Sequence, residues 1–164
     1  MIASAADLEW MSAALADART AGEAGEVPVG AVIVRDGAIV ARSGNRTFRD
    51  QDPTAHAEAL AIRDAAAAVG SWRLEGCTIY VTLEPCAMCA GAIVLARLER
   101  VVFGAWDAKV GMAGSVVDLL RHPRLNHQPQ VLAGVRADEC GALLTVFFRA
   151  RRGVDDAETQ RPTR

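Results

Sequence analysis

The sequence predicts an α/β domain with three layers, in which helices cover both faces of a sheet. Segments typical of buried strands alternate along the chain with segments of helical periodicity, the pattern that such a layered domain produces. The 164 residues, 51% of them hydrophobic and 23% charged, are enough for one domain with its own core. We expect residues 1–152 to form this domain and the polar residues 153–164 to be a disordered tail.

The chain begins with a predicted helix followed by a hairpin. Apolar residues recur at helical spacing over residues 7–21. Residues 29–34 and 39–41 are two short apolar runs, and the turn between them contains Asp36 and Gly37. Asp-Gly between two apolar runs is a strong signal for two antiparallel strands.

The middle of the chain predicts two helices on either side of a strand. Residues 55–69 are alanine-rich, and Gly70 is suited to end the helix that they form. Residues 78–82 are β-branched and apolar, which favours a buried strand. Residues 85–98 predict the next helix, with a proline suited to its first turn.

The last third of the chain predicts alternating short elements and a final helix. Residues 101–103 and 131–135 are expected to be strands, and residues 115–120 a short helix. Residues 138–152 predict the final helix.

The most informative motif places His56 and Glu58, in His-Ala-Glu, ahead of Cys86 and Cys89, in Pro-Cys-Ala-Met-Cys. One imidazole and two thiolates can hold zinc and leave its fourth position open to water, whose pKa zinc lowers toward neutrality. A nearby carboxylate that is not a ligand can then shuttle protons. This H-x-E…P-C-x-x-C arrangement is the signature of zinc-dependent nucleobase deaminases.

The helix starts are expected to bring the motif together. Residues 52–54 can cap and start the helix that carries His56, and residues 84–85 can start the helix that carries Cys86 and Cys89. Two helix N-termini would then meet at the metal, where their partial positive charge favours thiolates.

A closed structural zinc site and a redox cysteine pair are the alternatives to a catalytic zinc site. A closed structural site would need a fourth ligand such as Cys77 or Cys140, but both lie in apolar patterns that favour burial, and Glu58 would have no role. A redox Cys-x-x-Cys pair would give no role to His56.

Charge and targeting signals indicate in which compartment the protein is expected to act. The formal net charge of −2 argues against a generally basic nucleic-acid binder. No apolar run approaches the length of a membrane span, and no export signal opens the chain. Cysteines at metal spacing in such a chain favour a reducing cytoplasm.

Beyond the metal motif, the chain resembles the bacterial tRNA-specific adenosine deaminases over roughly residues 7–152. The segments that carry this resemblance are residues 27–32, 52–58, 80–92, 100–105, 114–115, 125–127 and 147–149. The resemblance implies a cytidine-deaminase fold with a mixed five-stranded sheet and a homodimer with one Zn²⁺ per subunit. It also implies conversion of adenosine to inosine at the wobble position of the anticodon stem-loop of tRNA-Arg.

The resemblance also implies roles for individual residues. His56, Cys86 and Cys89 correspond to the zinc ligands, Glu58 to the proton shuttle and Asn45 to an asparagine that binds the target base. The remaining expected RNA contacts are Val29, Leu83, Glu84, Pro85, Phe147, Phe148 and Arg149. Asn45 could instead be a turn residue, and the two phenylalanines could instead pack the final helix.

Two other functions fit parts of the sequence. A deaminase of a free base or nucleoside, such as guanine, cytosine or cytidine, would use the same zinc chemistry. A non-catalytic RNA-binding subunit would have no physical need for all four residues of the motif. Trp106 departs from the family, whose best-known members carry arginine there; it could stack on an RNA base or lie at a dimer contact.

Overall fold

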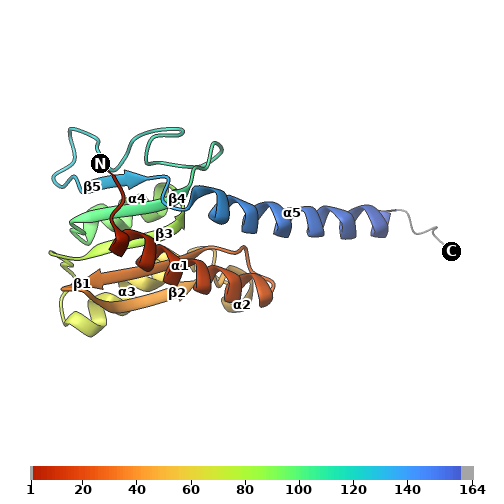
Figure 1. The fold of residues 1–164 in the computed structure, drawn as a ribbon, viewed down its shortest axis with the longest axis horizontal. Helices are drawn as coiled ribbons and strands as arrows, with labels where there is room; N and C mark the ends of the chain where they lie inside the picture. The colour runs from red at the N-terminus through yellow and green to blue at the C-terminus, as the bar shows by residue number, and fades with distance from the viewer. Residues whose placement is uncertain (1, 160–164) are drawn as a thin grey trace.

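The structure, a computed structural model, describes residues 2–159. Its helices are α1 (Ala5–Glu23), α2 (Thr47–Asp50), α3 (Ala57–Val69), α4 (Ala87–Leu95) and α5 (Ala137–Thr159). Its strands are β1 (Gly30–Arg35), β2 (Ala38–Gly44), β3 (Thr78–Leu83), β4 (Arg100–Ala105) and β5 (Gln130–Ala133). The strands form one mixed sheet in the order β2-β1-β3-β4-β5, which confirms the predicted fold class (Figure 1).

Helices cover both faces of the sheet. Helices α1 and α5 pack on one face, where Val32, Tyr80 and Val102 are buried. Helices α3 and α4 cover the other face, where Ile79 and Phe103 are buried. Side chains of one strand thus alternate between two cores, which is why the strands are apolar almost throughout.

The predicted hairpin is present. Strands β1 and β2 pair in antiparallel fashion, and the turn between them contains Asp36 and Gly37. Both residues have positive φ, 50° and 74°. Asp-Gly tolerates this left-handed turn, which matches the twist of the two strands.

The parallel half of the sheet brings distant loops together. Strands β3 and β4 are parallel, and Leu83 at the end of β3 is paired with Ala105 at the end of β4. The segments that follow these two residues therefore leave the same edge of the sheet. In open α/β sheets this carboxyl edge is the usual place for a ligand.

The structure differs from the predicted elements in three details, two of which concern short segments. Residues 115–120 form turns and an isolated bridge between Ala113 and Asp118 in place of a helix, because the N–H of Leu119 donates to the carbonyl of Met112 and not to that of Ser115. Helix α2 was not predicted.

The third detail is helix α5, which is longer than predicted and extends past the sheet (Figure 1). Its backbone is helical to Thr159, whereas the sequence pattern suggested an end near residue 152. Residues 160–164 of the expected tail lie outside the described part, and the boundary between domain and tail stays a prediction. Within residues 2–159, the helices are too short or too polar to cross a membrane.

Candidate metal centre and cavity

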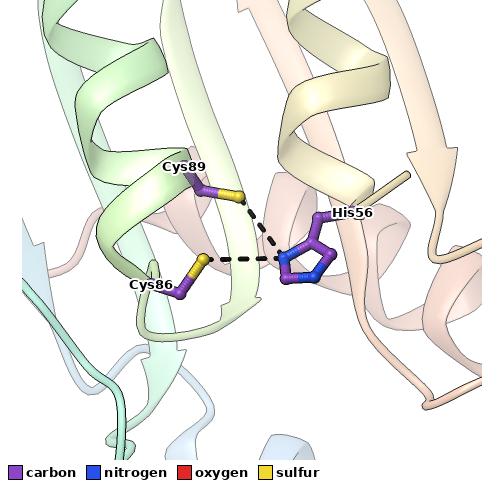
Figure 2. Close-up of side chains that lie close together, drawn as sticks. All are labelled: His56, Cys86 and Cys89. Atoms are coloured by element: carbon purple, nitrogen blue, oxygen red, sulfur yellow. Dashed lines mark hydrogen bonds between the residues drawn. The ribbon is translucent and has the colours of Figure 1, made fainter. Parts of the chain in front are cut away.

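Two helix N-termini converge on one group of potential metal ligands. His56 is the N-cap of α3, Cys86 is the N-cap of α4, and Cys89 lies in the first turn of α4. Both sulfur atoms point toward the imidazole (Figure 2), and each lies 3.6 Å from His56 Nδ1. The three ligand atoms lie within 4.8 Å of one another.

This group fits zinc. Typical Zn–S and Zn–N bonds of about 2.3 and 2.0 Å at a tetrahedral angle place sulfur and nitrogen roughly 3.5 Å apart. The observed separation of 3.6 Å matches that spacing without any rearrangement. Three protein ligands, one imidazole and two thiols, are the set expected where a fourth position stays open for chemistry.

The local electrostatics prepare Cys86 to be a thiolate. Hydrogen bonding from Cys89, followed by that from His56, lowers the pKa of the Cys86 thiol to about 4 despite partial burial. The pKa of His56 is raised, chiefly by its hydrogen bond with Cys86. The helix N-termini act in the same direction, because their partial positive charge stabilises an anion.

Glu58 lies beside the metal group in the first turn of α3, where only 4% of its surface is exposed. Burial raises the pKa of its carboxyl group to about 7. A carboxyl group that titrates near neutrality can both accept and donate a proton at physiological pH.

A cavity of about 210 Å³ opens in front of the metal group, and His56, Glu58 and Cys86 line it. Its remaining lining comes from three segments: the β1–β2 hairpin and its flanks, the end of β3, and the loop after β4. These contribute Val27, Val29, Asn45, Thr47, Leu83, Glu84, Asp107 and Val110. Four of the predicted substrate contacts, Val29, Asn45, Leu83 and Glu84, thus share one cavity with Glu58.

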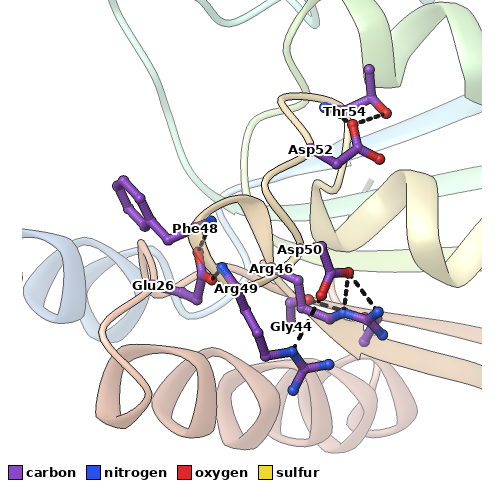
Figure 3. A network of polar contacts seen from close by, with 9 residues as sticks. Glu26, Gly44, Arg46, Phe48, Arg49, Asp50, Asp52 and Thr54 are labelled. Atoms are coloured by element: carbon purple, nitrogen blue, oxygen red, sulfur yellow. Dashed lines mark hydrogen bonds and ion pairs between the residues drawn. The ribbon is translucent and has the colours of Figure 1, made fainter.

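One wall of the cavity is held by a buried acid. Glu26, which is 2% exposed, accepts hydrogen bonds from the backbone N–H groups of Phe48 and Arg49 at 3.1 and 2.7 Å (Figure 3). It also accepts one from the Thr47 hydroxyl at 3.2 Å. These bonds satisfy the free donors at the start of α2 and hold Thr47 at the cavity.

Asn45 is placed by its backbone as much as by its side chain. Its N–H donates to the carbonyl of Val29 at 2.9 Å, and its side-chain amide donates to Thr47 Oγ1 at 3.5 Å. Only 7% of Asn45 is exposed, so the amide is available to the cavity and not to bulk water.

The predicted cap of α3 was wrong in detail. Asp52 Oδ1 accepts hydrogen bonds from the backbone N–H and the hydroxyl of Thr54, at 2.8 and 2.7 Å (Figure 3). The residue at the N-cap is His56 itself. Asp52 therefore shapes the turn before the helix, and the imidazole stays free for the metal.

The other predicted contacts lie outside this cavity. Pro85 is not among its lining residues, and Phe147, Phe148 and Arg149 belong to α5. The ring of Phe147 packs against the guanidinium of Arg151, whereas Phe148 is 46% exposed. Packing of the final helix, the alternative to RNA contact, therefore describes Phe147 better than Phe148.

Sequence reasoning missed four lining residues: Val27, Thr47, Asp107 and Val110. Asp107 could have been found, because it closely follows the predicted strand at residues 101–103 and so lies at the carboxyl edge of the sheet. Thr47 carried no comparable signal, because its position depends on α2 and on Glu26.

Comparisons with known proteins agree with this geometry. Residues 4–105 match the family described as the cytidine and deoxycytidylate deaminase zinc-binding region. A tRNA-specific adenosine deaminase of Bacillus subtilis is 53% identical over 143 residues, covering 87% of this chain and 89% of that protein. A tRNA-specific adenosine deaminase of Agrobacterium fabrum is 50% identical over 147 residues, covering 90% of this chain and 96% of that protein.

A solved structure from a study of A-to-I editing by tRNA:A34 deaminases at the wobble position of transfer RNA has the same fold. It is 49% identical to this chain and superimposes with a TM-score of 0.80. The match covers 83% of this chain and 99% of that one.

Proposed function

The chain belongs to the cytidine and deoxycytidylate deaminase family and, within it, to the tRNA-specific adenosine deaminases, and we propose that it deaminates adenosine to inosine at the wobble position of the tRNA-Arg anticodon. The observation that carries this proposal is the convergence of His56, Cys86 and Cys89 in one cavity with the buried carboxyl group of Glu58. The overall reaction consumes one water and releases one ammonia.

The cofactor is zinc, and His56, Cys86 and Cys89 would hold one ion. When bound, zinc supplies a water activated for attack at neutral pH. The low pKa of the Cys86 thiol and the two helix N-termini support binding of a cation at this point.

Glu58 moves the protons of the reaction. It takes one proton from the attacking water and delivers it to N1 of the adenine ring. It then takes the remaining proton of that water, from the hydroxyl group that is now on C6, and passes it to the amine, which leaves C6 as ammonia. Its position in the first turn of α3, two residues from a metal ligand, keeps the carboxyl group next to the attacked carbon throughout.

Asn45, Val29 and Leu83, together with the backbone at Glu84, are positioned to enclose the target base, because all four residues line the cavity that contains Glu58. Pro85 would contribute by starting the segment that carries Cys86. Phe147, Phe148 and Arg149 would contact the anticodon loop away from the reacting base, since α5 extends past the sheet (Figure 1).

A single-stranded anticodon loop suits this buried site. Attack at C6 requires the base to leave its stack, and the energetic cost is smaller in a loop than in a duplex. The target base would therefore enter the cavity while its neighbours stay on the surface.

We also propose that the protein is a cytoplasmic homodimer. Its cysteines are unpaired, as expected in a reducing compartment.

Apolar side chains such as Leu95 and Val117 are 74% and 50% exposed in the single chain, which supports an apolar contact between copies. Light scattering that found a fully active monomer would overturn the dimer.

Product analysis by mass spectrometry tests the function. Purified protein is offered a tRNA-Arg anticodon stem-loop with adenosine at the wobble position, alongside free adenosine, guanine, cytosine and cytidine. Inosine formed in the stem-loop alone is the expected result. Turnover of a free base or nucleoside alone would keep the zinc chemistry and overturn the RNA substrate.

A further inference from the structure

The carboxylate of Glu84 is buried beneath the loop of residues 107–115. Only 2% of Glu84 is exposed. Its oxygens accept hydrogen bonds from the backbone N–H groups of Asp107, Ala113 and Ser115 at 2.9, 2.9 and 3.0 Å, and from the hydroxyl group of Ser115. Four donors from one loop thus meet a single side chain, and an ionised carboxylate has the acceptor capacity for all of them.

The loop is wrapped so tightly around Glu84 that a side chain is excluded at Gly111. A Cβ atom at this position would overlap the Glu84 carboxylate and lie 2.6 Å from the carbonyl oxygen of Asp107. The backbone N–H of Met112 also donates to the carbonyl of Pro85 at 2.9 Å. The loop is therefore fastened to the segment that leads directly into Cys86.

The same loop forms one wall of the cavity. Asp107 and Val110 line the cavity together with His56 and Glu58. Trp106, directly before the loop, is 53% exposed and packs edge-on against Phe103 with ring centres 4.8 Å apart. A loop that presents polar and apolar groups at a cavity mouth must be held in one conformation to contribute to binding.

We propose that Glu84 is a positioning residue, whose carboxylate fixes the 107–115 loop as the cavity wall against which the substrate RNA binds. This inference rests on the proposed function for its substrate. The opposite wall is built in the same way, because buried Glu26 binds the backbone of α2 beside Asn45 and Thr47. Each of these two segments at the cavity is thus anchored by one buried acid.

The test combines amide hydrogen exchange, followed by NMR on the zinc-loaded protein, with kinetics on the anticodon stem-loop. In Glu84→Gln, the side-chain amide places N–H donors opposite backbone N–H donors, so the bonds to Asp107, Ala113 and Ser115 cannot all form. We expect faster exchange at these three amides, roughly a tenfold rise in KM, and kcat within about threefold of the unmodified enzyme. Zinc content should remain one per chain.

Two further variants keep the test decisive if Glu84→Gln fails to fold. Gly111→Ala leaves the carboxylate intact but forces the loop away from it, so it should reproduce the faster exchange and the higher KM. Ser115→Ala removes only the hydroxyl donor and should give a smaller effect in the same direction. Gly141→Ala is the control, because its Cβ would make only an ordinary 4.0 Å contact with Ala105.

Unchanged exchange at the loop amides in both Glu84→Gln and Gly111→Ala would overturn the tethering. Fast exchange at the loop amides of Glu84→Gln with an unchanged KM would overturn the role of the loop in substrate binding. A lower kcat with unchanged KM and loss of zinc from this variant would overturn it as well. The exchange measurement needs no substrate. An unmodified protein that is inactive on the stem-loop therefore refutes the proposed function and leaves the exchange data to decide whether Glu84 holds the loop.

Discussion

The guanidinium carbon of Arg151 lies 4.7 Å from the centre of the Phe48 ring. It also lies 4.8 Å from the centre of the Phe147 ring, and one of its nitrogens donates to the carbonyl of Gly25 at 2.9 Å. Arg151 thus joins the long helix α5 to α2 and to the segment that carries Glu26. The cavity wall formed by α2, which follows edge strand β2, is consequently in contact with a helix that follows β5, the strand at the opposite edge of the sheet.

Removing this contact should weaken the link between α5 and α2. Arg151→Ala is expected to lower the free energy of unfolding by about 1 kcal/mol, since it removes an exposed cation–π contact and one hydrogen bond. Urea denaturation followed by circular dichroism measures the change. Arg152→Ala, at the next position on the exposed surface, is the control. Equal effects of the two substitutions would mean that the contacts of Arg151 with Phe48, Phe147 and Gly25 together contribute nothing to stability.

Glu58→Ala should abolish turnover without loss of metal or fold. Glu58 is buried beside the ligands but does not belong to the metal group, so its removal eliminates proton transfer alone. We expect a loss of at least about 10²-fold in kcat, the usual contribution of a general acid–base group. Zinc content and stem-loop kinetics are measured on the same sample. A near-normal rate or loss of zinc would contradict the role of Glu58 in proton transfer.

Cys86→Ala should lose the metal. The substitution leaves only His56 and Cys89 as ligands, and two ligands bind zinc more weakly than three. It also removes the thiol whose pKa is lowered to about 4 and which is therefore ready to bind a cation. Zinc per chain, measured by plasma mass spectrometry after dialysis, should fall well below one. Cys77→Ala is the control, since Cys77 is buried in the core away from the metal group and should keep full zinc occupancy. A fully metallated Cys86→Ala protein would rule out this ligand.

Acid should weaken the fold through Asp7. Its carboxylate lies 2.6 Å from Arg100 and accepts a hydrogen bond from the Tyr80 hydroxyl, and the pairing with Arg100 holds the pKa of Asp7 well below its usual range. An aspartate in the unfolded chain has a pKa near 4, whereas the pKa of Asp7 in the folded protein is lower. The ion pair therefore contributes its full stability above pH of about 4, and this contribution is lost as the pH falls toward the pKa of the folded state.

We therefore expect the free energy of unfolding to fall by on the order of 2 kcal/mol on acidification below pH of about 4. Asp7→Asn should be less stable at neutral pH and should show a flatter acid limb in urea titrations at several pH values. Parallel acid limbs for the two proteins would show that Asp7 titrates alike in the folded and unfolded states.

Much of the metal centre could be predicted from sequence because its ligands are close in the chain to the signals that place them. Cys86 and Cys89 are three residues apart at the start of one helix, and His56 opens another, so local geometry places each ligand at a helix start, while the packing of the two helices brings them together. The alanine-rich pattern that ends at Gly70 likewise predicted α3, and Gly70 has the expected left-handed conformation.

Residues 115–120 show where this reasoning failed. Their apolar spacing is typical of a helix, but the N–H of Ser115 and the N–H of nearby Ala113 bond to Glu84, some thirty residues away in the chain. These bonds fix the start of the segment, and the N–H of Leu119, which would donate to the carbonyl of Ser115 in a helix, donates to the carbonyl of Met112 at 2.9 Å. Propensity is a weak local preference, and the tertiary contact overrode it.

The sequence by itself determined the fold class, the hairpin turn at Asp36 and Gly37, and the candidate ligands His56, Cys86 and Cys89, because alternating periodicities, one dipeptide and two short motifs are visible in the chain. The meeting of His56 with the two cysteines depends on the packing of α3 beside α4. Only the tertiary structure decided which side chains share the cavity with Glu58 and which buried acids hold its walls. Asp107 meets Glu84 because β3 and β4 are paired, and Thr47 meets Glu26 because β1 and β2 are paired. Such contacts depend on strand order and on buried hydrogen bonds between distant segments, which local patterns in the chain do not encode.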